Sequence, residues 1–98
     1  MTISMAADPA RFALPTELTM QGAARALLQL RQSLAQQAGP AVTLDAQGLQ
    51  VLDSSAVAVL LELRRELQQQ GRSLALSHPP QRLRDLMALY GVSELLPT

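Results

Sequence analysis

The sequence predicts one α/β domain over residues 1–98, with a mixed β-sheet of four to five strands covered by three to four helices. Three observations support this prediction. A chain of 98 residues is long enough for one hydrophobic core but short for two. Short apolar runs alternate along the chain with longer segments of helical periodicity. The apolar runs are nearly continuous, which is typical of strands covered by helices.

The N-terminal segment, residues 2–14, contains two short stretches in which apolar and small or polar residues alternate, at 3–5 and at 12–14. Alternation of this kind predicts two short strands. Asp8-Pro9 lies between them, and the proline favours a turn because it restricts its own backbone and that of the preceding residue. We therefore expect a hairpin here, with a frayed N-terminus as the alternative.

The first helix is predicted from Met20 to Ala38, after a connection at residues 15–19 in which Thr16 or Thr19 caps the helix. Apolar residues recur at spacings of three and four and form one stripe for the core. This stripe consists of Ala23, Leu27, Leu30 and Leu34, with Met20 beside it. Gly39-Pro40 is a typical helix stop.

The rest of the chain continues the same alternation of strands and helices. The expected elements are a strand at 41–45, an extended piece at 49–52, a helix at 54–70, a strand at 73–77, a helix at 81–90 and a closing turn or short helix at 92–96. Pro80 suits the first turn of the last long helix. That helix is expected to bury Leu83, Leu86, Met87 and Tyr90.

The sequence contains few of the residue types that catalysis and metal binding need. There is no cysteine and a single histidine, His78, which precedes two prolines and is expected in a loop. A hydrolytic triad, a metal site and a glycine-rich phosphate loop each need several convergent groups that the sequence lacks. We therefore predict no catalytic residue, no metal and no cofactor.

Charge and hydropathy also exclude several partners. Eight Arg balance eight Asp plus Glu, and the chain has only one Tyr and one Phe, so neither a basic surface nor base stacking indicates nucleic-acid binding. No apolar run approaches the roughly 18–20 residues of a membrane span. The N-terminus lacks the pattern of a signal peptide, and we expect a cytoplasmic protein.

The segment Asp53-Ser54-Ser55 separates two apolar runs and is the most informative turn in the sequence. Its side-chain oxygens can cap the helix that follows, and many Asp-Ser pairs before helices do only this. A hydroxyl at this position could also accept a phosphoryl group, which adds about −1.5 to −2 charges at neutral pH. Phosphate is tolerated at a helix N-terminus, so such a modification would change docking rather than folding.

The helix predicted after this turn has an apolar stripe for the core, made of Ala56, Val59, Leu60, Leu63 and Leu67. Its opposite face carries Ser54, Ala58, Leu61, Glu62 and Arg65, with Ser55 and Gln69 at its margins. Small and apolar residues in the first two turns, surrounded by polar ones, indicate a docking surface. The alternative is a helix packed on both sides inside the domain.

From Thr43 to Leu96 the sequence resembles the STAS domain family, named for sulfate transporters and anti-sigma-factor antagonists. The resemblance depends on the strand Val42–Leu44, the turn Leu52–Ser55 with its Leu-rich helix, the strand Leu74–Leu76 and the segment Leu89–Val92. In this family the residue after the turn aspartate is the regulatory phosphorylation site of the antagonists. The corresponding residue here is Ser54. Many antagonists have glycine where this chain has Ala56.

Within the family the sequence looks most like the small STAS subunit of Mla-type ABC transporters, with Leu89-Tyr90 and a tail containing Leu95-Leu96-Pro97. This resemblance implies a non-catalytic subunit at the cytoplasmic side of the inner membrane. It would bind and stabilise or activate the ATPase of a complex that moves phospholipid between the membranes of Gram-negative bacteria.

The partner-binding residues expected on the ATPase side are Asp53, Ser54, Ser55, Ala58, Leu61, Glu62 and Arg65. The alternative is an anti-sigma-factor antagonist switched at Ser54. An exposed apolar face can also pair two isolated copies into a homodimer.

Overall fold

The structure of the chain is a computed structural model that describes residues 10–36 and 39–98. The described elements, in chain order, are β1 (Ala10–Ala13), β2 (Glu17–Leu18), α1 (Ala23–Ala35), β3 (Ala41–Asp45), β4 (Val51–Leu52), α2 (Ser54–Gln69), β5 (Ser73–Ser77), α3 (Gln81–Leu89) and the 3₁₀ turn η2 (Ser93–Leu95). The predicted α/β class is confirmed.

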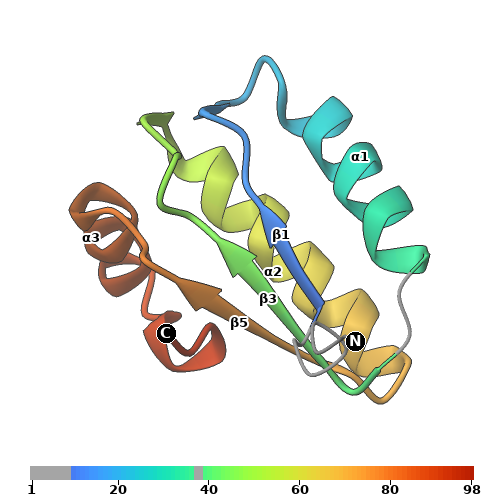
Figure 1. Cartoon of the computed structure of the whole chain (residues 1–98). Helices are drawn as coiled ribbons and strands as arrows, with labels where there is room; N and C mark the ends of the chain where they lie inside the picture. Colours follow the sequence, from blue (N-terminus) through green and yellow to red (C-terminus); the bar gives the residue numbers. More distant parts are fainter. Residues whose placement is uncertain (1–9, 37–38) are drawn as a thin grey trace, which may run out of the picture.

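The described strands form two parallel sheets, one in the order β1-β3-β5 and a small one that pairs β2 with β4. The mixed sheet expected from the sequence is thus parallel in every described pair, because α1 and α2 return the chain to the starting edge before each new strand. In Figure 1, α2 runs behind the three strands, with α1 on one side of it and α3 on the other.

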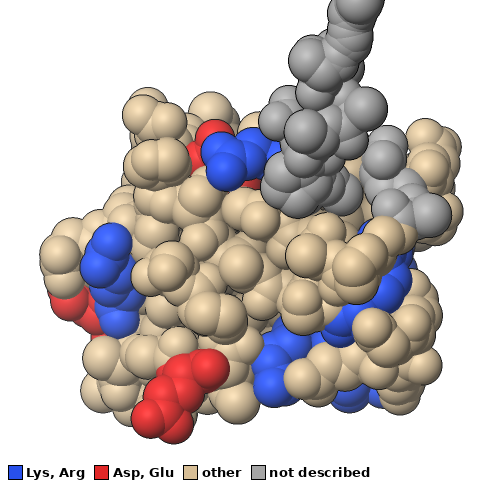
Figure 2. Space-filling model, turned by 60° about the horizontal axis from the view of Figure 1, so that its bottom comes forward, with Lys and Arg blue, Asp and Glu red and all other residues tan. Residues whose placement is uncertain are grey.

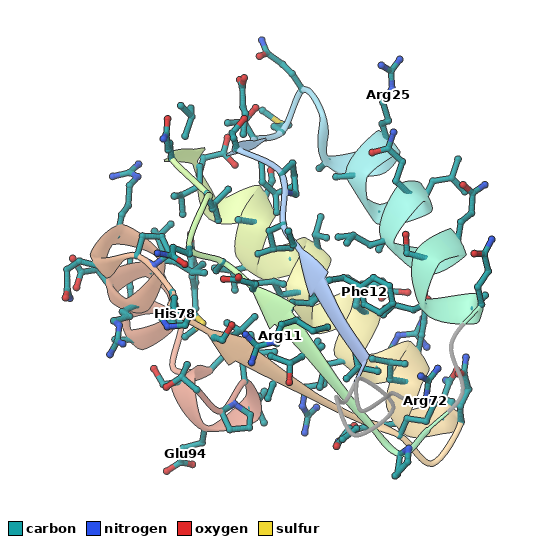
Figure 3. All side chains as sticks on the ribbon, viewed as in Figure 1. Arg11, Phe12, Arg25, Arg72, His78 and Glu94 are labelled. Atoms are coloured by element: carbon teal, nitrogen blue, oxygen red, sulfur yellow. The ribbon has the colours of Figure 1, made fainter. Side chains whose placement is uncertain are left out.

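The core lies between the sheet and α2. Register places Val42 beside Leu74 and Leu44 beside Leu76, and all four side chains are buried. Their neighbours along each strand, Thr43 and Ala75, are half-buried on the opposite face. Phe12 of β1 points toward α1 (Figure 3), where it packs against the core. The five residues predicted as the core stripe of α2 are all buried.

The first helix begins three residues later than predicted, at Ala23. Gly22 is its N-cap and makes no side-chain capping bond, so the prediction that Thr16 or Thr19 caps the helix was wrong. Thr19 instead accepts a hydrogen bond from Gly22 N through its backbone carbonyl, at 3.0 Å. Met20, expected in the helix beside the core stripe, therefore lies before the helix and is 76% exposed.

Two further sequence predictions concern the N-terminal region. The predicted strand at 3–5 and the turn at Asp8-Pro9 lie outside the described residues, whereas the predicted strand at 12–14 corresponds to β1. The connection predicted at 15–19 contains the strand β2, which pairs Leu18 with Leu52. A two-residue strand is too short to show periodicity, so the sequence could not reveal it.

The last helix ends at Leu89, and the prediction that Tyr90 is buried was wrong. Gly91 adopts a φ of +70° and donates to Ala88 O, while Val92 N donates to Met87 O, a Schellman arrangement. This turn directs Val92 toward the core and leaves Tyr90 52% exposed. Leu83 and Met87 are buried as predicted, and Leu86 is half-buried.

Arg72 joins the start of β5 to the end of α1. Its Nε donates to Gly39 O at 2.7 Å and its Nη1 to Leu34 O at 3.4 Å. Leu34 lies in the last turn of α1, where carbonyls lack a partner within the helix, and Gly39 lies in the chain that follows α1. Figure 3 shows Arg72 at this end of the molecule.

We expect Arg72→Gln to lower the free energy of unfolding by about 1–2 kcal/mol, because two carbonyls lose a charged donor. Urea denaturation of the variant and of Arg25→Gln, whose parent side chain is exposed and points away from α1 (Figure 3), measures the difference. Equal midpoints for the two variants would contradict this role of Arg72.

Candidate docking site

The turn before α2 is built by the side chain of Asp53. Its Oδ1 accepts a hydrogen bond from Ser55 N at 2.8 Å and so caps the helix. Its Oδ2 accepts one from Met20 N at 3.1 Å, which ties the chain after β2 to the start of α2. These bonds from Met20 and Ser55 hold the pKa of the Asp53 carboxyl below its ordinary value because they favour the charged form.

Because folding lowers the pKa of Asp53, we can predict how the stability of the protein changes with pH. A carboxyl whose pKa is depressed by folding stabilises the protein above its unfolded pKa of about 3.9, and this contribution is lost as the pH falls through the folded value. We expect Asp53→Asn to have a lower urea midpoint than the parent chain at pH 6–8, with the gap closing below about pH 4. A gap that is the same at pH 3 and pH 7 would contradict the assignment.

A shallow hollow of about 320 Å³ lies beside the first two turns of α2. It is lined by Ser54, Val57, Ala58, Leu61 and Tyr90. Ser54 and Ala58 are exposed and Leu61 is half-buried. The outer face of α2 is therefore accessible to solvent rather than packed within the domain. Ser54, Ala58 and Leu61 share one face because they are four and three residues apart on a helix.

Tyr90, at the C-terminal end of α3, forms the second wall of the hollow. Its ring is half-exposed, and the preceding Leu89 is 75% exposed. Arg82 fixes the other end of α3 against the Ser54 turn, since its Nε donates to Leu52 O at 3.1 Å. The hollow therefore combines side chains of α2 with the side chain of Tyr90 at the C-terminal end of α3.

Charged side chains border the outer face of α2 on the α1 side. Glu62 accepts a hydrogen bond from Arg65 Nε at 3.1 Å and lies 3.6 Å from the Arg31 guanidinium of α1. The hydrogen bond from Arg65 is the largest of the influences that lower the pKa of Glu62 to about 2, followed by Glu66 and, more weakly, Arg31. Arg31 also pairs with Glu66, so this margin is an ion-pair network between α1 and α2.

The structure brings together only some of the residues predicted to bind a partner. Ser54, Ala58 and Leu61 line the hollow, and Arg65 follows one turn further along α2. Asp53 and Ser55 are half-buried in the turn, and Glu62 faces Arg31. Sequence reasoning missed Val57 and Tyr90. The available signal for Tyr90 was Gly91, which places it at a helix end.

The described residues, those of the hollow included, contain no group of three or more potential metal ligands. The Nδ1 of His78, which is labelled in Figure 3, lies 3.8 Å from Asp45 Oδ1, and the side chain is largely exposed. Figure 2 shows one face on which charged side chains form small separate groups around an uncharged centre. No described helix has the length and apolar character to cross a membrane.

The fold and the family of the chain follow from comparison with known proteins. The structure is similar to that of the anti-sigma-factor antagonist SpoIIAA in its unphosphorylated form, with a TM-score of 0.72 and 20% sequence identity. The match covers 92% of this chain and 80% of that chain, and it shows the fold. No curated protein matches the chain. The family model described as "Mlab, STAS domain" matches residues 1–97, and the chain belongs to this family.

Proposed function

We propose that this chain is the STAS subunit of a Mla-type ABC transporter, and that it binds and stabilises or activates the ATPase subunit without catalysing a reaction. The observation that carries the proposal is the apolar hollow between α2 and α3, lined by Leu61, Ala58 and Tyr90 and open to solvent. The family match, with its Mlab description, supports the same partner.

The chemistry of the hollow suits recognition of a protein. A volume of about 320 Å³ accommodates an apolar side chain, and Tyr90 adds a rigid aromatic wall with a polar end. Binding of one folded partner to another shifts the folding equilibrium of both toward the native state, which is how a subunit without catalytic groups stabilises an ATPase. In this proposal the complex lies at the cytoplasmic face of the inner membrane and moves phospholipid between the two membranes.

Co-expression with the ABC ATPase and permease encoded by neighbouring genes tests the proposal. We expect this chain to copurify with the ATPase and to raise its yield or its rate of ATP hydrolysis. Leu28→Ser, which changes an exposed leucine on α1 outside the hollow, should copurify with the ATPase as the parent chain does. Absence of a complex with the ATPase would overturn the proposal.

The second candidate is an anti-sigma-factor antagonist, favoured by the exposed Ser54 hydroxyl at the first position of α2. Incubation with kinases encoded near the gene, followed by intact-mass measurement, separates the two candidates. Addition of one phosphoryl group that is lost in Ser54→Ala would favour the antagonist. Neighbouring genes for a kinase and a sigma factor would favour it as well.

A further inference from the structure

A separate cavity of about 220 Å³ lies between the C-terminal parts of α1 and α2. It shares no lining residue with the hollow beside Ser54. Three leucines that are at most 4% exposed contribute to its wall: Leu34, Leu63 and Leu67. The longer polar side chains that line it are Arg31, Glu66, Gln70 and Arg72. An apolar wall with a few polar groups is typical of sites that bind small molecules.

Only one of the two arginines at this cavity is paired with a carboxylate. Arg31 forms an ion pair with Glu66. Arg65 and Glu62 extend this network with one charge of each sign. Arg72 forms no ion pair with another described residue, and its hydrogen bonds go to carbonyl oxygens. The cavity wall therefore carries one positive charge that no described carboxylate balances.

The guanidinium of Arg72 also has a nitrogen without an acceptor. Nε and Nη1 donate to Gly39 O and Leu34 O, whereas Nη2 is buried and has no hydrogen-bond partner. A buried donor without an acceptor lowers stability, and native proteins usually provide such a group with a partner. A negatively charged acceptor would satisfy the donor and balance the charge together.

We propose that this cavity binds a small organic acid, a monocarboxylate on a short alkyl chain, with its carboxylate at Arg72 and its chain against the three leucines. The planar guanidinium suits a carboxylate, and the one unbalanced charge suits a monoanion better than a phosphate dianion. The cavity is smaller than the roughly 300–1,000 Å³ that drug-sized ligands occupy, so the chain must be short. This inference is independent of the ATPase.

Titration of the isotope-labelled chain with pentanoate, followed by the NMR shifts of its backbone amides, tests the site. We expect saturable shifts at residues 31–35 and 63–72 with a Kd of about 1 mM, as suits so small a ligand. Pentanol has the alkyl chain without the charge, and inorganic phosphate has the charge without the chain, so both should bind at least about tenfold more weakly. Absence of saturable shifts, shifts confined to other residues, or equal binding of pentanol or phosphate would overturn the inference.

Two variants test the residues of the site, and their amide spectra also show that they are folded. Arg72→Gln removes the charge and should raise the Kd for pentanoate by at least about tenfold. Because this change also lowers stability, Ala35→Leu provides a second test that leaves Arg72 in place. Ala35 is exposed and lines the cavity, and leucine is a good helix former that would fill part of the space.

Ala35→Leu should likewise raise the Kd by at least about tenfold. The matched control is Ala24→Leu, which enlarges an exposed alanine of α1 that does not line the cavity and should bind pentanoate like the parent chain. A folded Arg72→Gln or Ala35→Leu chain that binds pentanoate as tightly as the parent would overturn the site. Equal weakening by Ala35→Leu and Ala24→Leu would overturn it as well.

Discussion

Ala58→Glu is expected to raise the Kd for the ATPase by about 100-fold or more, the largest effect we predict. Ala58 is exposed in the middle of the hollow, so the new carboxylate would enter a site that an apolar partner surface closes. Burying an unpaired charge costs far more than the contact of one methyl group. Glutamate is a good helix former, so α2 itself should persist. Titration of the purified ATPase with the variant measures the change.

The matched control is Ala24→Glu, which places the same carboxylate on an exposed alanine of α1 outside the hollow. It should bind like the parent chain, and both variants should keep the parent's thermal midpoint within a few degrees. If Ala58→Glu has the same Kd as the parent chain, the hollow is not part of the binding site. Equal weakening by both variants would indicate a general effect of charge instead.

Ser54→Glu is expected to raise the Kd by about 10- to 100-fold. The helix tolerates an acid at its first position because the N-terminal dipole favours negative charge, so stability should hold or rise slightly. The partner would have to bury that acid at the edge of the hollow, and binding should fall. Equilibrium binding and thermal denaturation of the same preparation measure both effects.

Ser54→Ala provides the comparison, since it removes the hydroxyl without adding charge. It should bind within about threefold of the parent chain if the apolar surface supplies most of the affinity. Ser54→Glu binding as well as Ser54→Ala would show that the turn lies outside the interface, which would contradict the docking site proposed here.

The sequence allowed α2 to be placed almost completely. Its start at Ser54 follows from Asp53, whose carboxylate can cap a helix, and its end near Gly71 from the left-handed backbone that glycine adopts at φ +74°. The buried strands at 41–45 and 73–77 were equally clear, because each is a short apolar run between turns. Such elements can be predicted because the residues within them and at their ends are typical of a helix or a strand.

Elements without a local signal were not predicted. The strand β2 exists because Leu18 can pair with Leu52, a partner 34 residues away, and nothing near Leu18 indicates this. The start of α1 was misplaced because the helix has no side-chain cap at Gly22. Met20 was placed in the helix beside the core stripe for the same reason, whereas the helix begins only at Ala23.

In the candidate site, too, some residues could be predicted from the local sequence and others could not. Ser54, Ala58 and Leu61 could be grouped from the sequence because helical spacing alone places them on one face. Tyr90 could not be added, because it reaches the hollow only through the packing of α3 against α2. The bond between Asp53 and Met20 likewise depends on the fold, since the two residues are far apart in sequence.

Hydrogen–deuterium exchange of this chain, free and bound to the purified ATPase, tests the docking face most directly. We predict slower exchange in the complex at residues 54–61 and 86–91, with unchanged exchange on the outer face of α1. Protection confined to α1 or to the open face of the sheet, with residues 54–61 unaffected, would contradict the account.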